Sequence, residues 1–519
     1  MQLKELVIPS TVTSIGDDAF KSLAALETVV FAEDSQLETL GASVFANCAS
    51  LKSITLPPKL ETLSYGAFSG CTSLESITLP SMLKTIQTSP VNRKVDGVSI
   101  TFHFSYAFQD CTALKHLDMS ACTQLTELPT YLLDGCDNIE ALLLPPNLAT
   151  IHDCAFGNLP YKSGKLTSRL PNLKEITIPA SVTSIGGYVF AGCKSLQTVI
   201  FEKGSQMTEL GTAEAKNGNP LWGQYIFAGT TSLKTVVLPE KLTTIGISCF
   251  ENSSVTEIDL PSSVKAIGKR AFKNCDNIKD AGLSANLVYL GDEAFYDCDS
   301  LETADLAFGL DYLGFRAFAY CRQLKKAYIP ATVTGISGNP FMGCTGVESL
   351  ELDPDSVDFV LVDGVLYDAA MQTLIYYPAS LTAETFEIPD TVSQIAAGAF
   401  AGARLKSIFM SERITEISSY AFQDSSIEII TLHRGIMAIG DNAFAGMANL
   451  KEIFIEGGVD CNMSANAFVM LIDDVNIYFT NYTYDEIVEE VGYAWFTNAS
   501  RKAHFYFRDT IPEDVEQPK

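Results

Sequence analysis

Apolar residues recur along this chain with a period of about 23 residues. The segment from Leu3 to Phe20 reads LKELVIPSTVTSIGDDAF, and a later segment from Leu173 to Phe190 reads LKEITIPASVTSIGGYVF. The repeat that fits them is L-x-x-I-x-[IL]-P-x-x-[LV]-x-x-I-G-x-x-A-F-x-x-C-x-x. Counted on its phenylalanine slot, which Leu133 fills once, this repeat occurs seventeen times. The chain therefore consists of one element repeated along nearly its whole length.

Each repeat contains the pattern of a short strand. Leu6 and Ile8 lie two residues apart, so they face the same side of a strand, while Val7 faces the other side. Pro9 ends the strand because it cannot donate a hydrogen bond to a ladder. Phe20 returns to the interior later in the repeat. One repeat cannot bury its apolar face alone, so neighbouring repeats must stack.

A period of 20–29 residues with this leucine spacing is typical of a leucine-rich repeat solenoid. We therefore predict a mostly β fold of the α/β repeat class, a right-handed solenoid of about 17 repeats of ~23 residues with a parallel concave sheet. Residues 1–474 are expected to form the solenoid, and residues 475–519 a C-terminal cap and tail. Four segments interrupt the period: residues 87–105, 159–171, 212–224 and 353–382, the last expected to be a hairpin.

Nine cysteines share one slot, three residues after the phenylalanine slot. They are Cys48, Cys71, Cys111, Cys136, Cys193, Cys275, Cys298, Cys321 and Cys344. Other repeats place Leu23, Thr230 or Ala403 there, a mixture that a metal-ligand position would not tolerate. We therefore predict a buried column of thiols that act as small apolar side chains, without structural disulfides.

The I-P…I-G…A-F-x-x-C signature resembles that of the BspA-type leucine-rich repeat family over almost the full chain. The segment from Asp353 to Pro378 resembles a hairpin insertion often seen in that family, with D-G-V-L-Y and L-I-Y-Y-P as its strands. The resemblance implies a secreted or cell-surface protein, typically of oral or gut bacteria and some mucosal protists. It also implies adhesion to host matrix proteins, host cells or other microbes. Because the chain starts inside a repeat, we expect a signal peptide upstream that has been trimmed.

The net charge of the chain disfavours some classes of partner. The chain has 35 Lys and Arg against 62 Asp and Glu, a net charge of −27. Nucleic acid is disfavoured as a partner because phosphate binding needs a basic face. No apolar run reaches the ~18 residues that a transmembrane helix needs. The chain is expected to be a monomer.

Catalytic and metal chemistry find little support in the sequence. The five histidines are His103, His116, His152, His433 and His504, which are far apart in a fold where only neighbouring repeats touch. Known catalytic and phosphate-binding motifs are missing. The aspartates after Asp353 do not match an EF-hand loop. We expect no enzyme activity, no cofactor and no metal.

The second and fourth residues after each lead residue should face outward on the concave sheet, where such proteins commonly bind partners. Small or hydroxylated residues fill these positions in the first repeats, as at Thr28 and Ser53. Acidic residues follow in the middle, at Glu257, Asp259, Asp280 and Asp305. Large apolar residues come last, at Tyr328, Phe409, Ile429 and Phe454. The acidic group is either a solvated face or a site for a cation or basic partner. The apolar group is either an interface or a surface that the cap or hairpin covers.

The insertions supply further candidates, since loops on rigid scaffolds carry function. Trp222 lies in the segment 212–224, next to Tyr225, and the segment 159–171 is locally basic through Lys162, Lys165 and Arg169. The leading hypothesis is an extracellular protein that binds a protein or glycan of the host or of neighbouring microbes. One alternative is a glycan-binding module in which aromatic side chains stack on sugars: Trp222, Tyr225, Tyr328 and Phe409. The other is an intracellular structural scaffold.

Overall fold

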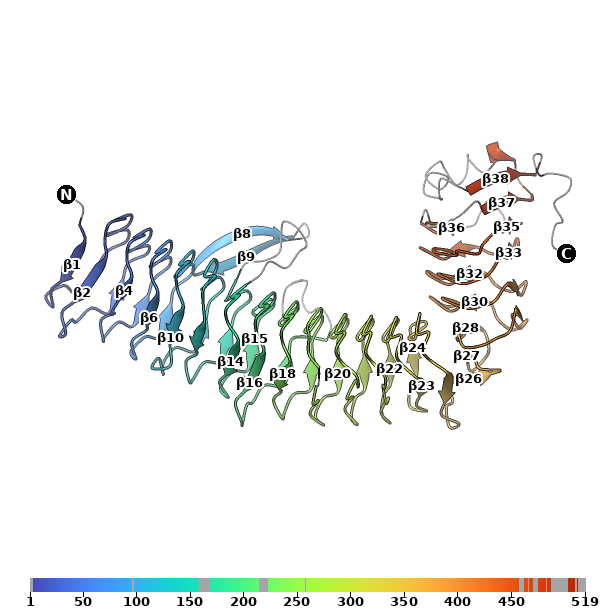
Figure 1. Cartoon of the computed structure of the whole chain (residues 1–519), viewed down its shortest axis with the longest axis horizontal. Helices are drawn as coiled ribbons and strands as arrows, with labels where there is room; N and C mark the ends of the chain where they lie inside the picture. Colours follow the sequence, from blue (N-terminus) through green and yellow to red (C-terminus); the bar gives the residue numbers. More distant parts are fainter. Residues whose placement is uncertain are drawn as a thin grey trace. The chain divides into compact units, whose positions relative to one another are not determined.

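A computed structural model shows a mostly β, parallel-strand solenoid of about 19 turns with almost no helix (Figure 1). It describes residues 3–95, 98–157, 169–213, 223–256, 258–456, 462–464, 466–469, 475–481, 483–486, 503–508 and 511. The chain forms two compact units. The N-terminal unit comprises residues 1–278 and 284–287, and the C-terminal unit comprises residues 279–283 and 288–519. The predicted fold class is confirmed.

One parallel ladder follows the lead residue of each turn, and we call it the front ladder. In the N-terminal unit its first sheet contains β1 (Glu5–Ile8), β2 (Thr28–Phe31), β4 (Ser53–Ile54), β6 (Ser76–Thr78), β10 (His116–Asp118) and β12 (Ala141–Leu143). Its second sheet contains β14 (Glu175–Ile178), β16 (Thr198–Phe201) and β18 (Thr235–Val237). Exposure alternates as predicted, because Ile8 is buried while its neighbour Val7 is exposed.

A second ladder, which we call the corner ladder, uses two-residue strands just before the I-G corner. In the N-terminal unit it has three parallel parts. They are β3 (Thr39–Leu40), β5 (Thr62–Leu63) and β7 (Thr85–Ile86); β11 (Glu127–Leu128), β13 (Thr150–Ile151) and β15 (Ser184–Ile185); and β17 (Glu209–Leu210), β19 (Thr244–Ile245) and β20 (Ala266–Ile267). The insertion at residues 87–105 forms an antiparallel hairpin of β8 (Ser89–Val95) and β9 (Val98–Phe104).

The C-terminal unit repeats both ladders. Its front ladder contains β23 (Lys326–Ile329) with β25 (Ser349–Leu352), and β29 (Thr385–Glu387), β31 (Ser407–Phe409), β33 (Ile429–Leu432), β35 (Glu452–Ile455), β37 (Val475–Phe479) and β38 (Ala503–Phe507). Its corner ladder begins with β21 (Tyr289–Leu290), β22 (Tyr312–Leu313) and β24 (Gly335–Ile336). Strands β37 and β38 pair in parallel beyond the last phenylalanine slot, so the front ladder extends past residue 474.

The insertion after β25 adds three strands to the corner ladder of the C-terminal unit. Strand β26 (Phe359–Val362) pairs antiparallel with β27 (Val365–Asp368), which pairs antiparallel with β28 (Thr373–Tyr376). The ladder then continues in parallel through β30 (Gln394–Ile395), β32 (Glu416–Ile417), β34 (Ala438–Ile439) and β36 (Asn462–Met463). The segments D-G-V-L-Y and L-I-Y-Y-P thus supply two neighbouring antiparallel strands.

The phenylalanine slot builds columns of stacked rings in each unit, with one interruption at Leu133 in the N-terminal unit. Ring centroids lie 5.4 Å apart between Phe227 and Phe250, and 5.3 Å apart between Phe250 and Phe272. Offset stacking at this spacing contributes beyond the burial of apolar area. The column fills the interior between the two ladders and holds successive turns in register.

The predicted column of buried thiols is confirmed for the described residues. All twelve described cysteines are buried and none of them forms a disulfide, and Cys461 lies outside the described residues. The structure adds a polar role, because the thiol donates to the phenylalanine carbonyl of the preceding turn. The Sγ–O distances are 3.2 Å from Cys71 to Phe45, 3.1 Å from Cys275 to Phe250 and 3.0 Å from Cys321 to Phe295. Thr230 fills the same slot but differs, because its hydroxyl donates to the Phe227 carbonyl of its own turn at 2.7 Å.

Asn339 joins the turns on either side of the long insertion. Its buried Nδ2 donates to the carbonyl of Gly398 at 2.8 Å, and its Oδ1 accepts the N–H of Phe341 at 2.9 Å. The N–H of Asn339 also donates to the carbonyl of Ala397 at 2.9 Å. The solenoid therefore stacks directly across residues 340–396, and the added strands do not interrupt it at this point.

We expect Asn339→Ala to lower the free energy of unfolding of the C-terminal unit by about 2 kcal/mol, because it leaves a buried carbonyl and a buried N–H without partners. Urea denaturation measures this change. Asn481→Ala is the matched control, since Asn481 makes a comparable bond to the carbonyl of Glu456 at an exposed position. Equal effects of the two substitutions would contradict the assigned role of Asn339.

Candidate functional site

Large aliphatic side chains are exposed on the front ladder of the N-terminal unit. Leu143 on β12, Ile200 on β16 and Val237 on β18 have exposed fractions of 51%, 38% and 48%. Ile200 and Val237 are direct neighbours in the sheet register, and Thr177 on β14 pairs with Ile200 on its other side. We call Leu143, Ile200 and Val237 the aliphatic stripe. Exposed apolar residues grouped on one rigid face are typical of a binding surface.

Sequence analysis missed the aliphatic stripe although the signal was present. Each of its members is the fourth residue after a lead residue, the position that the repeat assigns to the outward face. The sequence-based description covered the hydroxylated positions of the first repeats, such as Thr28 and Ser53, and the acidic positions from Glu257 onward, but not the repeats between them. The sequence signal of the stripe is a large aliphatic residue at this fourth position in three repeats.

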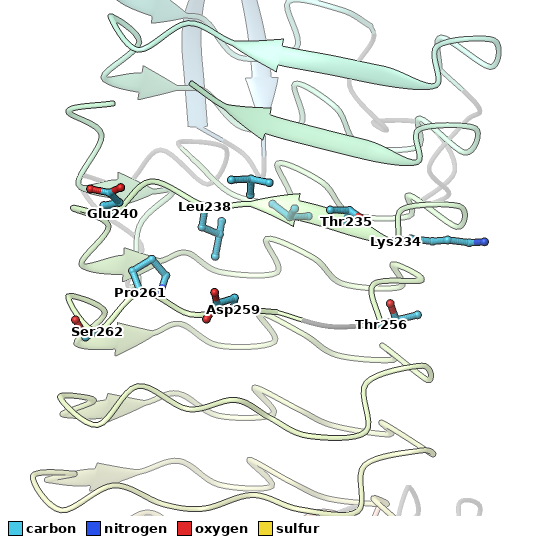
Figure 2. Close-up of a pocket in the computed structure, with 10 residues that line it drawn as sticks. Lys234, Thr235, Leu238, Glu240, Thr256, Asp259, Pro261 and Ser262 are labelled. Atoms are coloured by element: carbon cyan, nitrogen blue, oxygen red, sulfur yellow. The ribbon is translucent and has the colours of Figure 1, made fainter. Parts of the chain in front are cut away.

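A groove of about 520 Å³ continues from the stripe at the edge of β18 (Figure 2). Among the described residues β18 is the last strand of its sheet, and the groove lies between it and the following turn. Val237 of β18 and Leu238 directly after it provide apolar surface, while Asp259 and Thr256 line the groove from the next turn. Lys234 and Glu240 add charges from the turn that carries β18. The stripe and groove together form an apolar surface with a charged rim, which is the usual composition of a protein interface.

The acidic candidates do not form one site in the structure. Asp259 lines the groove of the N-terminal unit, whereas Asp280 and Asp305 are exposed in the C-terminal unit. Asp280 accepts the N–H of Gly282 at 3.0 Å and therefore stabilises its own turn. Glu257 lies outside the described residues. Among the described residues, no group of three or more His, Cys, Asp or Glu side chains could hold a metal ion.

The large apolar candidates of the C-terminal unit divide into exposed and buried members. Phe409 is 60% exposed and Ile429 is 41% exposed, which fits the outward assignment. Phe454 is only 1% exposed, which fits the alternative in which this surface is covered. Its ring stacks on Tyr478 of β37 at 4.9 Å, and Tyr478 stacks on Tyr506 of β38 at 5.0 Å. The neighbouring strands therefore add aromatic cover that the repeat pattern alone does not reveal.

Tyr328 is half-buried and its polar end is already engaged. Its hydroxyl donates to Oδ2 of Asp353 at 2.6 Å. This hydrogen bond is the main cause that raises the pKa of Tyr328 to about 12, and it lowers the pKa of the Asp353 carboxyl. Asp353 also accepts the N–H of Asp355 at 3.0 Å. The pair thus anchors the start of the long insertion.

The remaining insertion candidates have structural partners where they are described. Tyr225 is half-buried and stacks on Tyr188 at 4.9 Å, while Trp222 lies outside the described residues. Arg169 is buried, so it does not add positive charge to the exposed surface of the segment 159–171. Its Nη1 donates to the carbonyl of Tyr188 at 2.9 Å. Gly157 makes room for it, since a Cβ there would lie 2.4 Å from Cδ of Arg169.

The two basic neighbours expected beside Arg169, Lys162 and Lys165, lie outside the described residues. In the described part of the chain, no helix has the length and apolar character to cross a membrane.

Stacked parallel turns with leucine, phenylalanine and cysteine slots define a leucine-rich repeat protein. The chain matches the family described as "BspA type Leucine rich repeat region" over residues 1–104, 92–171, 168–213, 222–348 and 375–508. It therefore belongs to the BspA-type leucine-rich repeat family. Among curated proteins, none matches the chain at a significant level.

Several solved structures are similar to the chain. A leucine-rich repeat protein from Bacteroides ovatus is 19% identical with a TM-score of 0.42, covering 97% of this chain and 91% of that one. The pneumococcal vaccine antigen PcpA is 17% identical with a TM-score of 0.35, covering 88% and 93%. A leucine rich cell surface protein from Faecalibacterium prausnitzii is 18% identical with a TM-score of 0.24, covering 99% and 92%.

Proposed function

We propose that this protein is a non-catalytic, adhesin-like binding protein of the bacterial cell surface. Its site on the N-terminal unit is the aliphatic stripe of Leu143, Ile200 and Val237 together with the adjoining groove. The stripe is the main observation behind the proposal. Moving large aliphatic side chains from water into an interface is favourable, so their exposure on a regular sheet indicates a binding surface. Membership of the BspA-type family supports a surface location and a binding role.

The chemistry of the surface favours a protein as the partner. A standard protein interface combines an apolar centre with a polar rim, and the stripe and the groove's charged residues match that composition. The net charge of −27 favours a partner with basic residues at its rim. A glycan would need exposed aromatic platforms. Of the described candidates for that role, Tyr225 and Tyr328 are engaged by other residues, and Phe409 alone is largely exposed.

The proposal is tested by the binding of the full chain to immobilised fibronectin and fibrinogen at physiological salt. We expect saturable binding that weakens about tenfold or more in the triple variant Leu143→Thr, Ile200→Thr, Val237→Thr, because central apolar residues dominate interface energetics. Threonine already occupies the equivalent position at Thr177, so the substitutions are compatible with the sheet.

Two outcomes would contradict this assignment. Phe409→Thr with Ile429→Thr alters a comparable exposed surface on the C-terminal unit and should leave binding unchanged. Loss of binding in this control alone would move the site to that unit. Failure of the unaltered chain to bind either matrix protein would remove the matrix-adhesin assignment.

A further inference from the structure

The corner ladder of the N-terminal unit is open between β7 and β11. In the preceding step of the ladder, the N–H of Gln87 donates to the carbonyl of Leu63 at 2.8 Å. In the following step, the N–H of His152 donates to the carbonyl of Leu128 at 2.9 Å. Among the residues that the structure describes, no equivalent hydrogen bond joins β7 to β11, and the two strands end separate sheets.

Pro129 explains one of the missing bonds. It occupies the position that Gln87 and His152 hold in their turns, directly after the corner strand. Proline has no N–H, so it cannot donate to the carbonyl of Ile86. The edge of β7 therefore presents carbonyl groups at ladder spacing to the space beside it. Exposed strand edges of this kind bind extended segments by adding a strand.

A cleft of about 980 Å³ lies along this open edge, next to the β8–β9 hairpin. Four segments line it: the β7 turn, strand β9, the turn that carries β11 and the turn that carries β13. The lining is rich in hydroxyl groups, from Thr85, Thr88, Thr101, Thr126 and Thr130. None of its described lining residues is Phe, Tyr or Trp, so it offers no platform on which a sugar ring could stack.

The fixed charges of the cleft favour a basic side chain. Glu127 lines it with His152, whose Nε2 lies 3.2 Å from Oε2 of Glu127. Asp153 also lines it and accepts the N–H of Gly187 at 2.6 Å. Burial raises the pKa of Asp153 to about 6, so this carboxylate remains mainly ionised at pH 7.5. The single lysine of the lining, Lys84, is paired with Glu61 at 2.7 Å.

We propose that the cleft between β7 and β11 binds an extended peptide that adds to the edge of β7 and places a Lys or Arg side chain against Glu127 and Asp153. Alternate backbone N–H groups of the peptide donate to the carbonyls of Lys84 and Ile86. The threonine hydroxyls and His103 contact its side chains. This site is separate from the aliphatic stripe, so it does not depend on the function proposed above.

The test uses a phage-displayed library of random octapeptides selected on the full chain. We expect enriched peptides that contain Lys or Arg. Fluorescence anisotropy then measures their affinity as synthetic peptides. Two further copies of each peptide carry N-methyl groups on the odd-numbered or on the even-numbered backbone nitrogens. The copy whose methylated nitrogens face β7 should bind about tenfold more weakly, because its hydrogen bonds to the β7 edge are lost. Asp153→Asn, which keeps an acceptor for Gly187, should weaken the basic peptides about fivefold or more.

Thr126→Trp fills the cleft at an exposed position and should abolish binding. Thr39→Trp is its matched control on the same ladder, since Thr39 is exposed on β3 and lies outside the cleft. The variant lacking the aliphatic stripe should retain full peptide binding. The proposal is overturned if no peptide is enriched, or if enriched peptides bind the Thr126→Trp variant as well as the unaltered chain. It is equally overturned if N-methylation in both registers has no effect.

Discussion

Replacing Phe422 with Ala is expected to lower the free energy of unfolding of the C-terminal unit by about 3–5 kcal/mol. Phe422 is fully buried, and its ring stacks on Phe400 at 5.2 Å and on Phe444 at 5.5 Å. The substitution removes apolar burial and leaves a cavity between two rings that the ladders hold in place. A solenoid turn contacts only its neighbours, so the loss cannot be shared with distant turns.

Urea denaturation followed by circular dichroism measures this change. Phe409→Ala is the matched control, because it removes the same side chain from a position that is 60% exposed. The control should change stability by less than about 0.5 kcal/mol. If both substitutions destabilise equally, the stacked column does not carry the stability assigned to it.

Raising the pH from 8 to 10 is expected to destabilise the N-terminal unit by about 4 kcal/mol through three of its buried thiols, Cys154, Cys193 and Cys275. Burial raises the pKa of Cys154, Cys193 and Cys275 to about 12 from the ordinary thiol value of 9.0. Between these pH values the unfolded chain loses the thiol protons while the folded chain keeps them. The folded state then binds more protons, so its stability falls as the pH rises above about 9. Each of the three thiols contributes about 1.4 kcal/mol between pH 8 and pH 10, nearly all of it above pH 9.

Reversible urea unfolding under reducing conditions at pH 8 and pH 10 measures this dependence. A variant with serine at Cys154, Cys193 and Cys275 should lose about 4 kcal/mol less between the two pH values, since serine does not titrate in this range. Comparing the pH dependence of the two proteins separates the thiols from other groups. A pH dependence that is the same in both would contradict the thiol assignment.

Most of the fold could be predicted from the local pattern of apolar residues within each repeat. The slots of Leu6, Ile8 and Phe20 recur along the chain, and their alternation decides which side of each strand is buried. The thiol slot followed from the same register, since nine cysteines share one distance from the phenylalanine slot. These features depend only on residues within one turn and its neighbours, so the sequence contains all the information that they require.

The candidate sites depended on contacts that the period does not encode. Phe454 occupies an outward position, yet it is buried because Tyr478 arrives from a strand beyond the last recognised repeat. Tyr328 is not available as a stacking platform, because its hydroxyl donates to Asp353, which lies 25 residues further along. The repeat pattern predicts only the side of the strand toward which a side chain points. Its exposure is decided by whatever packs on that face.

The sequence by itself determined the repeat, the parallel solenoid, the buried columns and the family, because each follows from short-range periodicity. Tertiary structure alone decided the burial of Arg169 beneath Tyr188 and the groove beside β18. It also decided the opening between β7 and β11. Pro129 lacks an N–H group, and this leaves an open edge only because Pro129 lies opposite Ile86. The physical reason is that a gap or a cover arises between turns, from residues that no single repeat contains.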